Sequence, residues 1–151
     1  MDYFHLNVDR EQLLSMSSLG LAHLGDGVFE VMVRSWIALH GKAKPKDLHR
    51  ATVTYVSAPA QAAAMEKLLP QLSEEEADVY RRGRNTAPHS VPKAASRAQY
   101  QAATGLEALF GWLYLQGRTQ RLNELFEIIM SCNEEGEEKE CPTNETTALS
   151  T

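Results

Sequence analysis

Residues 21–30, LAHLGDGVFE, constrain the fold more than any other stretch, because they lie inside a long apolar pattern of helical period. The polar side chains of this pattern recur at spacings of three and four residues, which places them on one narrow helix face: His23, Asp26, Glu30 and Arg34. The sequence therefore predicts a largely buried helix that carries two acids. Carboxylates in such a place need a cation, a hydrogen-bond partner or solvent.

The rest of the chain shows the same helical periodicity and no strand-like alternation of useful length. Capping residues mark the helix starts. They predict about seven helices. The first four cover residues 10–14, 15 or 17 to 40, 45–55 and 57 to about 70. The last three cover residues 73–85, which end in RRGRN, 96–115 and 119–131. Residues 85–95 hold two prolines and are predicted to form a long loop. The fold class is all-α, in one domain over residues 1–131.

Residues 132–151 are predicted to form a disordered acidic tail. They carry six Glu and one Lys, which accounts for the whole net charge of −5, so the body is neutral. Both cysteines, Cys132 and Cys141, lie in this tail and are interpreted as free thiols of a cytoplasmic protein. No run approaches the roughly 18 apolar residues of a membrane helix, and the first ten residues do not resemble a signal peptide.

The predicted helix 96–115 is the natural packing partner of the helix with the two acids. It is rich in small residues near Gly105 and Gly111, so another helix backbone can approach it closely, and Glu107 is its only acid. If the two helices cross at their glycines, Asp26, Glu30 and Glu107 converge. Oxygen ligands without Cys or an HxxxH pattern favour Mg²⁺ or Mn²⁺ over zinc.

Each of these acids also has an ordinary structural interpretation. Asp26 suits a capping or ion-paired acid, and Glu30 suits a pair with Arg34 one turn later. A cation such as Arg50 or Arg97 would explain Glu107. His23 fits the edge of the core or the solvent.

A second feature is a segment of basic residues without acids between Arg81 and Arg97. Arg81, Arg82, Arg84, Lys93 and Arg97 indicate an anion-facing surface, and Asn85 fits contact with phosphate. The alternative is an ordinary solvated face.

These motifs together resemble the ribonuclease III family. LAHLGDGVFE resembles its signature, with an LGD-x-V core in a helix, and TGLEALFGWLYL resembles its second acidic motif, DxFEALIGAxYL. LHRATVTYVSAPAQA and RRGRN with VPK nearby look like the small variant, Mini-ribonuclease III, which lacks the double-stranded RNA-binding domain. The resemblance runs from about residue 13 to residue 130.

The resemblance implies a homodimeric endoribonuclease that cleaves double-stranded RNA with Mg²⁺, Mn²⁺ being possible, in the maturation of precursor 23S ribosomal RNA. Asp26 and Glu107 match the catalytic, metal-binding acids of the two motifs. Ala22 and Thr104 stand where the larger ribonucleases III have Glu and Asp. These losses leave open a scaffold that binds structured RNA without cutting it. A metal-dependent nucleotide hydrolase is a third interpretation, but neither Asp26 nor Glu107 belongs to an ExxE-type pair.

Overall fold

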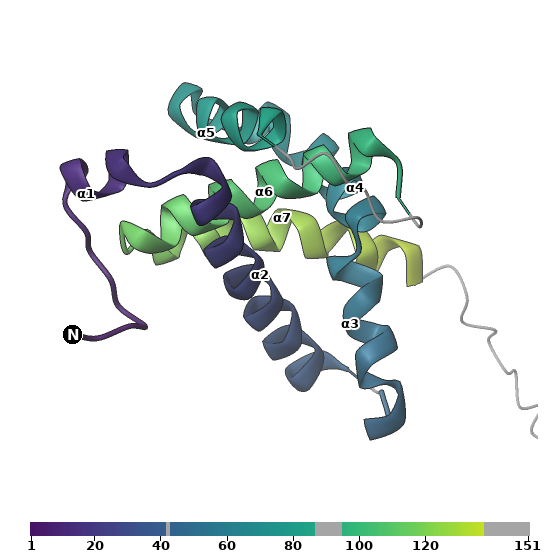
Figure 1. Ribbon diagram of the computed structural model, residues 1–151. Coiled ribbons are helices and arrows are strands. Elements are labelled where there is room, and N and C mark those ends of the chain that lie inside the picture. The colour runs from purple at the N-terminus through teal and green to yellow at the C-terminus, as the bar shows by residue number, and fades with distance from the viewer. Residues whose placement is uncertain (42, 87–94, 138–151) are drawn as a thin grey trace, which may run out of the picture.

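The computed structural model describes residues 1–41, 43–86 and 95–137, with side chains as far as Ser131 (Figure 1). Over these residues it confirms the all-α prediction with seven α-helices and no strand. They are α1 Arg10–Ser15, α2 Ser18–His40, α3 Leu48–Val56, α4 Ala58–Leu68, α5 Glu74–Asn85, α6 Arg97–Leu115 and α7 Thr119–Glu137. Single turns of 3₁₀ helix, Pro45–Asp47 and Leu69–Gln71, precede α3 and follow α4.

The predicted capping residues set the helix starts. Ser17, rather than Ser15, caps α2 by accepting a hydrogen bond from the Gly20 amide. α1, α5 and α6 each open with a capping box, in which the cap side chain and the side chain three residues later bond each other's backbone N–H groups. These local interactions fix where the helices begin independently of how they pack.

Helix α6 forms the centre of the molecule (Figure 1). It packs against α2, α4, α5 and α7, and most of its residues from Ala103 to Leu115 are buried. The aromatic core lies between α2, α6 and α7, where the Phe29 ring meets Phe110 and Phe126 edge to face at centroid distances of 5.4 and 6.2 Å. This packing holds the acid-bearing part of α2 against α6.

Two helix boundaries differ from the sequence prediction. The third predicted helix begins as the 3₁₀ turn at Pro45 and becomes α-helical only at Leu48. Helix α7 continues through Glu137 and so includes the first six residues of the predicted tail. The Glu residues there favour helix and no proline stops it. The rest of the tail, including Cys141, lies outside the described residues.

None of the described helices combines the length and the apolar character that crossing a lipid bilayer requires.

Candidate active site

The site lies where α2 crosses α6. The two backbones touch at two glycines, Gly25 on α2 and Gly111 on α6. A Cβ added at Gly25 would overlap the Glu107 carbonyl oxygen, and one added at Gly111 would overlap the Leu21 carbonyl oxygen. Only glycine allows this approach. A crossing at these glycines is the condition that the sequence analysis sets for the acids to converge, and the structure meets that condition: Asp26, the residue after Gly25, lies close enough to Glu107 for its charge to raise the pKa of Glu107.

Asp26 and Glu107 interact electrostatically across this crossing. Burial and the negative charge of Asp26 raise the pKa of Glu107 to about 7, and one hydrogen bond from Gln61 opposes the shift only in part. The pKa of Asp26 is also raised, by burial and by the charge of Glu30, while His23 lowers it. Among the described residues neither acid makes an ion pair, so the suggested partners Arg50 and Arg97 do not explain Glu107. Within the described ranges the pair therefore lacks a compensating cation.

Glu30 has an ordinary explanation. Arg34, one turn later on α2, donates to Glu30 Oε1 from Nε at 2.9 Å and from Nη2 at 2.5 Å. This confirms the predicted i, i+4 pair. Glu30 therefore lies beside the site with its own cation and acts on Asp26 through its charge.

Gln61 on α4 belongs to the site and was missed by the sequence analysis. Its Nε2 donates to Glu107 Oε1 at 3.3 Å, and its side chain is only 2% exposed. Together with Glu107 it lines a pocket of about 280 Å³ bounded by α4, α6 and the end of α3. A signal was available, because Gln61 is the only polar residue in the segment APAQAAAM at positions 58–65.

The two positions where carboxylates are absent are packed into the protein. Ala22 is buried, and the buried Thr104 hydroxyl donates to the Tyr100 carbonyl at 3.0 Å. In the described part of the chain no three His, Cys, Asp or Glu residues form a cluster suited to a metal ion. The acids of the crossing are thus two, Asp26 and Glu107.

The predicted basic residues of α5 are partly compensated. Arg81 and Arg82 lie 3.6 and 3.1 Å from the Asp78 carboxylate, one turn earlier. The Arg84 guanidinium lies over the Tyr80 ring at 5.8 Å, and its Nε donates to Asn85 Oδ1 at 3.4 Å. Lys93 lies outside the described residues.

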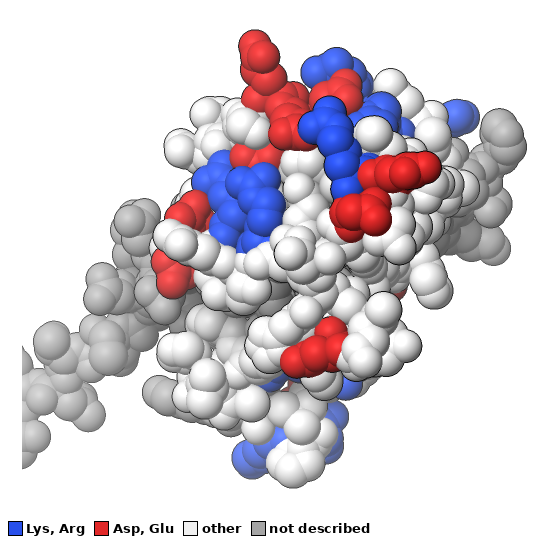
Figure 2. Space-filling view, turned by 90° about the vertical axis from the view of Figure 1, so that its left-hand side faces the viewer, with Lys and Arg blue, Asp and Glu red and all other residues white. Residues whose placement is uncertain are grey.

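Figure 2 shows the face on the α1 side. In its upper part, where α5 lies, basic and acidic side chains are interspersed and do not form a continuous basic band. The absence of acids between residues 81 and 97 is therefore true of the sequence but not of the surface around α5, because Asp78 contributes its charge there.

The fold and the site define a class of protein: in the part of the chain that the structure describes, a bundle of helices carries two acids without an ion-pair partner at the crossing of α2 and α6. Comparison with known protein families identifies the family of the chain. The sequence profile described as Ribonuclease III domain matches residues 19–118. The chain belongs to the ribonuclease III family.

Named relatives agree with this assignment. The chain is 45% identical to the Mini-ribonuclease 3 of Symbiobacterium thermophilum, over 82% of this chain and 95% of that protein. It is 41% identical to the Mini-ribonuclease 3 of a Thermoanaerobacter species, over 83% of this chain and 89% of that protein. A crystal structure of a protein from Fusobacterium nucleatum superposes with a TM-score of 0.72 at 26% identity, covering 79% of this chain and 95% of that one.

Proposed function

We propose that this chain, an endoribonuclease by family, hydrolyses phosphodiester bonds of double-stranded RNA with a divalent metal ion held by Asp26 and Glu107. The observation that carries the proposal is the convergence of these two acids at the glycine crossing without a cation of their own. Relatives named Mini-ribonuclease 3 support the same reaction class. Precursor 23S ribosomal RNA is the proposed substrate.

The residues present fit a hard divalent cation. Burial and the charge of Asp26 raise the pKa of Glu107, burial and the charge of Glu30 raise that of Asp26, and a divalent ion would stabilise the charged forms of both carboxylates. Mg²⁺ is commonly held by only one or two carboxylates, with waters and substrate phosphates as its other ligands. The lack of a third acid among the described residues is compatible with Mg²⁺, and also with Mn²⁺.

In this proposal the side chains of Asp26 and Glu107 position the divalent ion. The two acids lie on rigid helices, so their relative position is fixed before RNA binds. A divalent ion supplies activation of the attacking water and stabilisation of charge on the phosphate. Cleavage by this route leaves 5′-phosphate and 3′-hydroxyl ends.

RNA duplexes are recognised through their shape and backbone rather than through their base edges. Arg81, Arg82, Arg84, Asn85 and Lys93 are the proposed backbone contacts. The ion pairs of Arg81 and Arg82 with Asp78 are exposed and exchange readily for phosphate, because pairs of this kind contribute at most about 1 kcal/mol.

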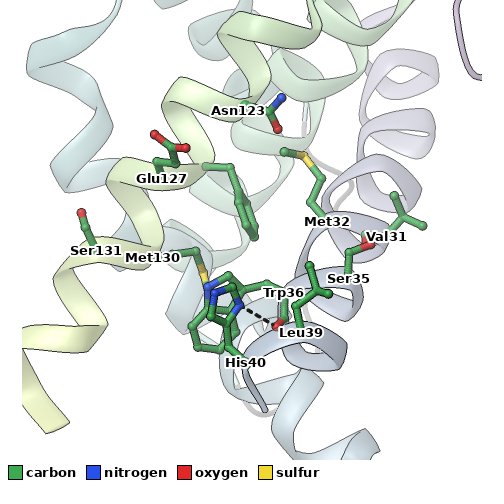
Figure 3. A pocket seen from close by; sticks show the side chains of 11 residues that line it. Val31, Met32, Ser35, Trp36, Leu39, His40, Asn123, Glu127, Met130 and Ser131 are labelled. Atoms are coloured by element: carbon green, nitrogen blue, oxygen red, sulfur yellow. Dashed lines mark hydrogen bonds between the residues drawn. The ribbon is translucent and has the colours of Figure 1, made fainter.

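The proposed enzyme is a homodimer, which presents one site to each strand of a duplex. A groove of about 690 Å³ between α2 and α7 suits the dimer contact (Figure 3). Its rim includes Val31 and Leu39, which are 57% and 82% exposed, and Met32, Trp36, Phe126 and Met130 also line it. Large apolar side chains exposed together mark an interaction surface.

The test is incubation of the purified protein with a ribosomal precursor duplex in Mg²⁺, with and without EDTA. We expect cleavage to 5′-phosphate products only with Mg²⁺, restored by excess Mg²⁺ or Mn²⁺ after EDTA. A single-stranded RNA of the same sequence serves as the control substrate. Binding of the duplex without cleavage in any divalent ion would support the scaffold alternative, which the carboxylates absent at Ala22 and Thr104 motivate.

A further inference from the structure

The Gln61 side chain is an unusual group to bury. It is 2% exposed, on an alanine-rich helix that packs against α6. A buried amide is costly unless both its N–H groups and its oxygen find partners. The partners that Gln61 does have therefore indicate what the side chain is for.

Both donors of the amide group are directed at oxygen atoms. Nε2 donates to the Val56 carbonyl at 2.9 Å and to Glu107 Oε1 at 3.3 Å. An amide turned the other way would place its oxygen against these two acceptors. The orientation of Gln61 is thus fixed, and it in turn holds one oxygen of Glu107.

The amide oxygen is left without a partner. Gln61 Oε1 is buried and receives no hydrogen bond from any described residue. An unmet acceptor of this kind destabilises the folded protein unless another role offsets it. A residue whose sole task was to bond the Val56 carbonyl would leave this cost unexplained, whereas a role in holding Glu107, an acid of the pocket that both residues line, accounts for a buried amide at this position.

We propose that Gln61 is a positioning residue for the metal site: its Nε2 holds Glu107 Oε1 and so would orient the Glu107 carboxylate for a divalent ion. This inference rests on the proposed function. Gln61 adds an amide to the pocket that Thr104 and Glu107 also line. Groups that orient a metal ligand typically change metal affinity by about 10–100-fold when removed.

The experiment compares Gln61→Met, which keeps the shape and removes the amide, with Gln116→Met. Gln116 makes a similar bond from Nε2 to a backbone carbonyl, that of Trp112 at 2.9 Å, but it contacts neither Asp26 nor Glu107. Mn²⁺ binding is measured by electron paramagnetic resonance without RNA, alongside the melting temperature. We expect Gln61→Met to weaken Mn²⁺ binding at least about tenfold and to lower kcat more than it raises KM. Gln116→Met should leave Mn²⁺ binding unchanged.

The outcomes separate this inference from the proposed function. A wild-type protein that binds Mn²⁺ and cleaves duplex RNA, with Gln61→Met binding Mn²⁺ equally well, overturns the inference alone. A wild-type protein that binds no Mn²⁺ overturns both.

A second measurement needs no variant. In ¹⁵N-resolved NMR spectra of the wild type, the side-chain NH₂ signals of Gln61 should shift on Mg²⁺ addition while those of Gln116 stay fixed. Gln61 signals that do not move in a protein that binds Mg²⁺ overturn the inference.

Discussion

Two regions of the molecule hold acids between packed helices, and the pKa values of these acids are shifted in opposite directions. At the α2–α6 crossing, Asp26 and Glu107 have raised pKa values and no cation among the described residues. Between α5 and α7, Glu76 is 2% exposed, yet its pKa is lowered: burial raises it, and hydrogen bonds from Arg121 and Ser73 outweigh burial. Arg121 donates from Nε to Glu76 Oε2 at 2.9 Å and from Nη2 to Oε1 at 3.0 Å.

The contrast separates a buried charge that stabilises the fold from the pair that we propose to serve catalysis. Glu76 also accepts the Ser73 amide in the capping box, and Arg121 also bonds the Gln71 carbonyl, so every strong group there is satisfied within the protein. The crossing pair keeps an electrostatic cost that a folding role does not require. Acids left in that condition characterise functional sites.

The largest expected effect comes from removing an uncompensated acid. Asp26→Asn should lower the cleavage rate about 1000-fold, equivalent to about 4 kcal/mol of barrier, while the melting temperature stays equal or rises because a repulsive charge is lost. Single-turnover cleavage and thermal melting measure the two effects. Glu30→Gln is the matched control, since Glu30 already pairs with Arg34, and it should cost less than about tenfold. Normal cleavage by Asp26→Asn would remove Asp26 from the mechanism.

The corresponding experiment in the other region removes Glu76, the acid that is paired with Arg121. Glu76→Gln leaves the Arg121 charge without its main partner and should lower the free energy of unfolding by about 2–3 kcal/mol, below the usual cost of a broken buried pair because the Arg121 side chain is 22% exposed. Cleavage per folded molecule should not change. Glu124→Gln removes the more exposed partner of Arg121 and should cost under about 1 kcal/mol. Equal losses in both variants, measured by urea denaturation, would contradict a special role for Glu76.

The helices and their caps were predictable because their signals are local, and the glycine crossing was predictable because small residues and a lone acid share the middle of α6. The Glu76–Arg121 pair and the Gln61–Glu107 bond were not, since they join residues 45 and 46 positions apart and no periodicity links them. Gln61 stands alone among alanines as Glu107 stands alone among apolar residues. A lone polar residue on an otherwise apolar helix is the same local signal in both cases, so the residue Gln61 was recognisable even though its partner was not.

The two regions should also respond oppositely to pH. Because the pKa of Glu76 is lowered in the folded state, its stabilisation is present above its usual pKa near 4.5 and is lost as pH falls through the lowered value. Because the pKa of Glu107 is raised to about 7 from a usual 4.5, the metal-free protein should lose stability as pH rises from about 4.5 to 7.

Chemical denaturation in EDTA, repeated across this pH range, measures how the free energy of unfolding changes with pH. Glu107→Gln should flatten the loss above pH 4.5, which amounts to at most about 3 kcal/mol, and Glu76→Gln should flatten the loss at acid pH. Mg²⁺ should restore stability to the wild type near neutral pH and have little effect on Glu107→Gln. A wild-type curve without the loss between pH 4.5 and 7 would contradict an uncompensated Glu107.

The smallest expected effect concerns α5, where the charges are exposed and only weakly compensated. Replacing Arg81, Arg82 and Arg84 by Ala should weaken duplex RNA binding by roughly tenfold, about 1.4 kcal/mol. It should also reduce the slope of log affinity against log salt by about one for each arginine that contacts a phosphate.

Asp78→Asn should change RNA binding in the direction opposite to the arginine replacements. It frees Arg81 and Arg82 from their shared partner, so it should strengthen binding and steepen the salt dependence, with little effect on stability because both ion pairs are exposed. Fluorescence anisotropy in Ca²⁺, across a salt series, measures both variants. If neither variant changes the slope, these arginines belong to an ordinary solvated face. The charges of Arg81, Arg82 and Arg84 would then have no role in binding RNA, as we expect for the charges of the Glu76–Arg121 pair, and other residues would contact the RNA backbone.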